Sequence, residues 1–70
     1  MSNDDVFKQL TEHYNLEQII LFCKMSAEVY DIMYKEMDAP IIENEDLYYE
    51  YDFQRMYWRN KYEELTNPKL

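Results

Sequence analysis

The residues that could carry chemistry in this chain are one cysteine, one histidine and fifteen acidic side chains. Cys23 lies in the apolar stretch LFCKM with no histidine beside it, which is typical of a small buried side chain and not of a nucleophile. His13 comes at the end of the first predicted helix, where the helix dipole stabilises a protonated imidazole. A structural zinc site needs several cysteines and histidines, so we predict no metal.

The acidic residues lack the setting that carboxylate catalysis requires. Catalytic carboxylate pairs depend on an apolar pocket, and a chain of 70 residues leaves little room for a cleft. The densest run, ENEDLYYEYD at residues 43–52, lacks the glycine and the regular oxygen spacing of a calcium-binding loop. The chain has no glycine, so it also has no glycine-rich phosphate loop. We expect a non-enzymatic protein without a cofactor; catalysis by a carboxylate pair is the less favoured alternative.

The distribution of charge is the strongest functional feature of the sequence. The net charge is −8, and residues 38–54 contain no base and these six acids: Asp38, Glu43, Glu45, Asp46, Glu50 and Asp52. Residues 55–70 contain four bases and two acids. Acids at the start of a helix and bases at its end suit the helix dipole and solubility, and this ordinary explanation stays open. The functional explanation is that the acidic stretch contacts a basic protein surface.

Aromatic side chains accompany these acids along residues 44–65. Tyrosine and tryptophan are enriched in interface hot spots, and charge would steer the encounter that they then hold together. The predicted partner-binding residues are Glu43, Glu45, Asp46, Tyr48, Tyr49, Glu50 and Asp52. For Tyr48 and Tyr49, packing within the protein is an equal alternative. Direct binding of nucleic acid is not expected, because the charge has the wrong sign.

Two capping patterns predict where the first helices begin. Ser2 is followed three residues later by Asp5, and Asn15 is followed three residues later by Gln18. The second helix then runs without a breaker to about Met37. These patterns predict a short helix followed by a long one.

Pro40 ends the second helical pattern, and Asn44 is a good cap for a third helix that runs through Leu65. Residues 47–53 also alternate as a strand would, but one helix accounts for the whole segment, so we predict a helix. The expected fold is all-α, with one short helix and two longer helices that form an antiparallel hairpin. Residues 1–66 would form a single helical domain, and residues 67–70 a frayed tail.

Both longer helices carry apolar side chains on two sides, which calls for burial on two sides. The residues predicted to serve the core or self-association are Leu21, Met25, Val29, Ile32, Phe53, Tyr57, Trp58 and Tyr62. A chain of this size buries only about 60% of its unfolded surface, and one cysteine allows no internal disulfide. We therefore expect a homodimer.

The sequence also bears on location. Its first residues are polar and acidic, unlike a secretory signal, and its longest apolar run is IILFC, far short of a membrane span. Together with an unpaired cysteine, these features predict a cytoplasmic protein that has no membrane partner.

The acidic run ENEDLYYEYD, the absence of glycine and the compact helical pattern resemble those of small phage-encoded inhibitors of host DNA machinery. Sliding-clamp inhibitors and DNA mimics are of this kind. The resemblance implies a host protein with a basic DNA-binding surface or channel as the partner, and no cofactor. The alternative function is structural, as an assembly component of a phage particle or another complex, acting through association of helices.

Overall fold

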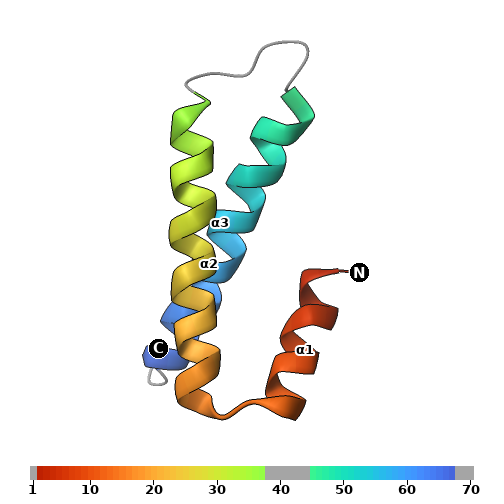
Figure 1. Cartoon of the computed structure of the whole chain (residues 1–70), viewed down its shortest axis with the longest axis vertical. Coiled ribbons are helices and arrows are strands. Elements are labelled where there is room, and N and C mark those ends of the chain that lie inside the picture. The colour runs from red at the N-terminus through yellow and green to blue at the C-terminus, as the bar shows by residue number, and fades with distance from the viewer. Residues whose placement is uncertain (1, 38–44, 68–70) are drawn as a thin grey trace.

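The computed structural model describes residues 2–37 and 45–67, which form three α-helices (Figure 1). Helix α1 spans Asn3–His13, α2 spans Leu16–Glu36 and α3 spans Glu45–Thr66. The described ranges contain no strand, so the all-α prediction is confirmed, including the helical prediction for residues 47–53. Pro40 and Asn44, which were predicted to break and restart the helices, lie outside the described residues.

Both predicted capping boxes are present. The Ser2 hydroxyl accepts a hydrogen bond from the Asp5 N–H at 3.2 Å, and the Asp5 carboxylate accepts one from the Ser2 N–H at 3.4 Å. Asn15 and Gln18 make the same reciprocal pair at 2.9 and 3.0 Å. These bonds satisfy N–H groups that the first turn of a helix leaves without a partner, and so they set where α1 and α2 begin.

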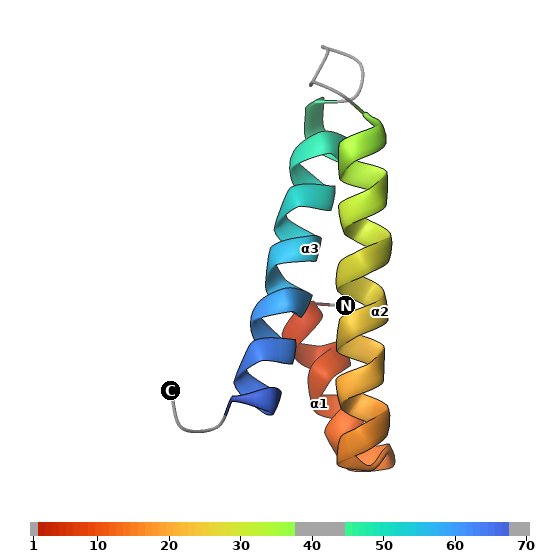
Figure 2. The same cartoon turned by 90° about the vertical axis from the view of Figure 1, so that its left-hand side faces the viewer.

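Helices α2 and α3 form the predicted antiparallel hairpin, and α1 folds back against one side of it (Figure 1). The view turned by 90° shows α1 behind the hairpin, level with the start of α2 and the end of α3 (Figure 2). No helix of the described residues lies over the other half of that side, which is formed by the end of α2 and the start of α3. The described chain is therefore a hairpin of α2 and α3, with the shorter helix α1 covering half of one side.

The core is small and centres on one ring. Ile19, Cys23 and Trp58 are the buried hydrophobic residues of the described ranges, with Cys23 0% and Trp58 3% exposed. The Trp58 ring meets the Phe22 ring edge-on at 5.3 Å between centroids, and its indole N–H donates to the Gln54 side chain at 3.1 Å. Helix α1 completes the cluster with Val6, Phe7 and Leu10.

Much apolar surface remains uncovered. The chain exposes 5525 Å², whereas a compact monomer of 8.8 kDa would expose about 4,800 Å². Eleven large hydrophobic side chains of the described ranges are exposed: Tyr14, Leu16, Leu21, Phe22, Met25, Val29, Ile32, Leu47, Tyr49, Phe53 and Met56. None of the helices in the described ranges combines the length and the apolar character needed to cross a membrane.

Candidate functional site

The acids predicted to bind a partner gather at the start of α3. Glu45, Asp46 and Glu50 lie in its first two turns, and all three are exposed. The positive end of the helix dipole favours carboxylates at this position. Glu43, the remaining predicted acid before the helix, lies outside the described residues. Three predicted carboxylates are thus brought together on one exposed helix end.

Asp52 has a different environment from these three acids. Its carboxylate lies 2.6 Å from the Arg55 guanidinium, and Arg55 also contacts Asp31 of α2 at 3.4 Å. The guanidinium is stacked over the Tyr34 ring at 4.3 Å, and the side chains of Asp52 and Arg55 are both half-buried. Asp52 therefore belongs to a cluster that joins α3 to α2, and its negative charge is balanced within the chain.

The adjacent residues Tyr48 and Tyr49 also have different environments. The Tyr48 hydroxyl donates to the Tyr34 hydroxyl at 2.9 Å, and the two rings pack 4.6 Å apart between centroids. This hydrogen bond raises the pKa of Tyr48. Tyr49 is 53% exposed, and its ring meets that of Tyr48 edge-on. Tyr48 thus packs against α2, while Tyr49 lies beside the exposed acids.

The remaining predicted residues fall into three groups. Trp58 is in the core, and Tyr57 and Tyr62 are half-buried against it. The exposed group comprises Leu21, Met25, Val29, Ile32 and Phe53. These five are available for association with a second molecule.

A contact between distant segments involves Asp4, an acid that was not among the predicted site residues. The Tyr57 hydroxyl donates to the Asp4 carboxylate at 2.7 Å, which ties the start of α1 to α3. Desolvation and this hydrogen bond together raise the pKa of Tyr57. Asp4 and Tyr57 are 53 residues apart, so no local spacing could have indicated their contact.

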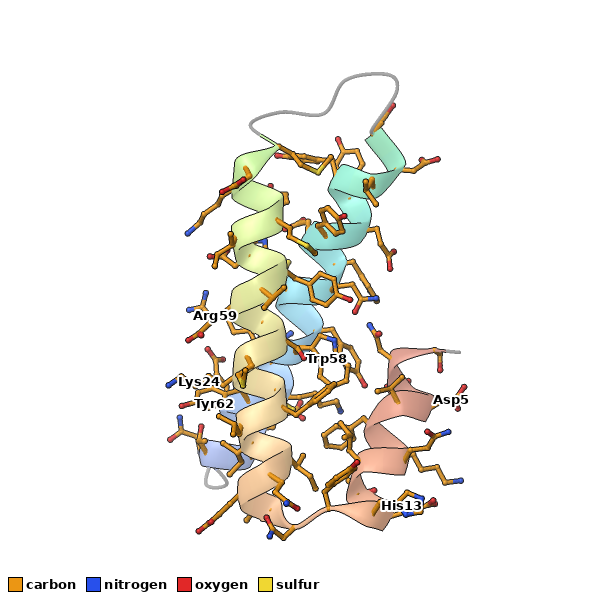
Figure 3. The ribbon with its side chains drawn as sticks, viewed as in Figure 1. Asp5, His13, Lys24, Trp58, Arg59 and Tyr62 are labelled. Carbon is orange, nitrogen blue, oxygen red and sulfur yellow. The ribbon has the colours of Figure 1, made fainter. Side chains whose placement is uncertain are left out.

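The bases concentrate on the opposite face of the hairpin. A groove of about 390 Å³ between α2 and α3 is lined by Lys24, Ala27, Glu28, Asp31, Lys35, Arg55, Arg59 and Tyr62. Figure 3 shows Lys24, Arg59 and Tyr62 on the side of α2 that faces away from α1. Four bases and two acids line this groove, although the whole chain is strongly acidic. This face of the hairpin is therefore locally basic.

Cys23 and His13 have the environments that the sequence predicts for them. Cys23 is enclosed in the core, and burial raises the pKa of its thiol, so the nucleophilic thiolate is disfavoured. His13 ends α1, as expected (Figure 3). Within residues 2–37 and 45–67, no group of three or more His, Cys, Asp or Glu side chains could hold a metal ion. What the described surface offers is charge and apolar area.

Comparison of the chain with models of protein families, with curated proteins and with solved structures finds no match.

Stability is expected to fall at alkaline pH because folding holds protons on Cys23, Tyr48 and Tyr57. Their pKa values in the folded chain are raised above the usual 9.0 for cysteine and 10.0 for tyrosine. This contribution is fully present below about pH 9 and is lost as the pH rises through the raised values. Urea unfolding at pH 8 and above pH 10 measures the loss. Tyr57→Phe should make this loss smaller, because it removes one of the three protons that folding holds.

Proposed function

We propose that this chain is a non-enzymatic binding protein that inhibits a DNA-associated protein of a host by occupying its basic DNA-binding surface. The observation that supports this function is the cluster of Glu45, Asp46 and Glu50, all exposed at the start of α3. The bases on this half of the hairpin, Lys35 and Arg55, are engaged by Asp31 and Asp52. The three carboxylates therefore keep their negative charge available for a partner.

The carboxylates and the aromatic side chains would have different tasks. Closely spaced carboxylates would attract the lysines and arginines that otherwise hold DNA phosphates, as in a DNA mimic, and would speed the encounter. Tyr49 and Phe53 are exposed beside them and would supply the area that holds the complex together. Inhibition would follow because the target cannot hold DNA and this chain on one surface.

A second copy of the chain is the other proposed partner. Leu21, Met25 and Ile32 form an exposed apolar stripe along α2, which we call the outer stripe. Burial of the outer stripe in a homodimer would remove these exposed apolar side chains from water. This stripe also supports the alternative function, an assembly component that acts through association of helices.

The experiment that tests the inhibitor function neutralises the exposed acids. The target is captured from nuclease-treated bacterial lysate on the immobilised chain, purified, and assayed for DNA binding in the presence of the chain. We expect the chain to displace DNA, and Glu45→Gln, Asp46→Asn and Glu50→Gln together to weaken its affinity for the target by about tenfold or more. Raising the salt concentration should weaken the unaltered complex as well.

The matched control removes three acids elsewhere: Glu12→Gln, Glu17→Gln and Glu28→Gln, all at exposed positions. Both triple variants change the net charge from −8 by three units, so a difference between them reports position and not total charge. Equal binding by the two variants, or a captured protein that keeps its DNA, would exclude the inhibitor function and favour assembly.

A further inference from the structure

Helix α1 is too short to cover the side of the hairpin on which it packs. It has 11 residues, whereas α2 has 21, which correspond to about 16 Å and about 32 Å of helix. The N-terminus of α1 lies about halfway along the hairpin (Figures 1 and 2). The helices of residues 2–37 and 45–67 therefore leave about half the length of this side uncovered.

Helical register identifies the side chains of the uncovered half. Phe22 of α2 lines a cleft with Leu10 and Tyr14, at the end of α1, and Tyr57 of α3 is bonded to Asp4. Side chains seven and eleven residues after Phe22, or four and seven residues before Tyr57, lie within about 40° of that residue around their helix, and the side chain ten residues before Tyr57 lies about 80° from it. These positions are Val29, Met33, Phe53, Glu50 and Leu47, which we call the open groove.

The open groove is apolar and largely exposed. Val29 is 51%, Phe53 59% and Leu47 46% exposed, and Met33 is half-buried. A cleft of about 290 Å³ marks the place where the groove meets the start of α1, and its lining includes Glu50, Phe53 and Tyr57. An apolar strip between two helices, in line with a third helix, has the form of a site for one more helix.

The charge around the open groove is of one sign. Glu50 lies in it, Asp46 lies one turn nearer the start of α3, and Asp4 lies where the groove meets α1. The bases of the described residues lie elsewhere. Four line the groove on the opposite face, Lys61 lies over the Phe7 ring beneath α1, and Lys8 is grouped with Asp5 and Glu12 on α1.

From this geometry and charge we infer that the open groove binds a basic amphipathic helix of the partner, which lies end to end with α1 and completes a three-helix arrangement. This inference rests on the proposed function and specifies how the target is held. Apolar side chains of the partner helix at i, i+3 or i+4 and i+7 would contact Val29, Leu47 and Phe53. Lysines or arginines beside that stripe would contact Glu50, Asp46 and Asp4. A second copy of the chain fits less well, because it brings a net charge of −8 to an acidic site.

A selection experiment tests the inference while the target is still unidentified. A display library of randomised helical peptides of about 14 residues, or about 21 Å of helix, is selected on the immobilised chain. We expect the enriched peptides to combine one apolar stripe with lysine or arginine beside it. Fluorescence anisotropy of labelled peptides should show binding weakened by about tenfold or more in Phe53→Ser and in Glu50→Lys. These positions are exposed, so circular dichroism should show an unchanged fold.

The matched controls are Leu21→Ser and Glu28→Lys. Leu21 is as exposed as Val29, but it lies about 100° around α2 from Phe22, and Glu28 lines the opposite groove. Binding should be unchanged in both controls. Enrichment of acidic peptides, of peptides that match the chain's own helices, or of none would overturn the inference. Peptides that bind Phe53→Ser and Glu50→Lys as tightly as the unaltered chain would overturn it as well.

The two proposals can fail separately. The Phe53→Ser variant could displace DNA from the captured target as well as the unaltered chain does. The inhibitor function would then stand, and the open groove would not be the means of binding. If basic peptides bind in the groove but no captured protein loses its DNA, the groove is a helix-binding site and the inhibitor function is excluded.

Discussion

Replacement of Trp58 by alanine is expected to remove most of the stability of the fold. Truncation of a buried tryptophan costs about 3–5 kcal/mol, and a chain of 70 residues has about 4–10 kcal/mol to lose at usual stabilities per residue. Trp58 contacts Phe22, Tyr57 and Gln54, so its removal opens the core where α2 and α3 meet. Urea titration followed by far-ultraviolet circular dichroism measures the loss without the tryptophan signal.

Two further variants show whether the effect belongs to the core position. Tyr49→Ala also removes a large aromatic side chain, but from an exposed site, and should cost less than about 1 kcal/mol. Trp58→Phe keeps a ring in the core and loses the hydrogen bond to Gln54, so its effect should lie between the two. If Trp58→Ala and Tyr49→Ala had equal stability, the small core around Trp58 would not be what holds the fold together.

The helix starts could be predicted from the sequence because their determinants are local. In each capping box the two partners are three residues apart, so the pattern of Ser2 with Asp5, and of Asn15 with Gln18, is visible in the sequence itself. The ion pairs of Arg55 with Asp52 and of Arg59 with Glu63 join residues three and four positions apart, so their helical spacing is also visible in the sequence. Interactions within one helical turn do not depend on the tertiary fold.

The choice of buried face could not be made in this way. Both Cys23 and Leu21 lie on apolar faces of α2, yet Cys23 is enclosed and Leu21 is exposed. Periodicity identifies both faces, but only the packing of α3 and α1 decides which one is covered. The interactions that dock these helices join residues far apart in sequence, such as Arg55 with Asp31 and Tyr57 with Asp4. The contact of Arg55 with Asp31 also ties the pair of Arg55 and Asp52 to α2, which separates Asp52 from the other acids of the candidate site.

Self-association through the outer stripe is the second large effect that we expect. Met25→Glu and Ile32→Glu together should convert a dimer into a monomer in sedimentation equilibrium, because each places a charge where the interface would exclude water. Both side chains are exposed in the single chain, so the variant should keep its helices. The matched control, Met56→Glu with Tyr14→Glu, adds the same charge at exposed apolar positions outside the stripe. An unaltered chain that sediments as a monomer, or equal dissociation of both variants, would exclude the outer stripe as the interface.

Salt concentration should separate this self-association from binding of the target. Two chains of net charge −8 repel each other, and added salt screens that repulsion while it leaves the burial of Met25 and Ile32 largely unaffected. The dimer should therefore become tighter as salt rises, whereas the complex with a basic target should become weaker. The dimer affinity from sedimentation and the affinity for the target, each plotted against salt concentration over the same range, should have slopes of opposite sign. A dimer that dissociates as salt rises would instead be held by contact between two charged surfaces. One is the groove of one chain that Lys24, Lys35, Arg55 and Arg59 line, and the other is the acidic start of α3 in the second chain.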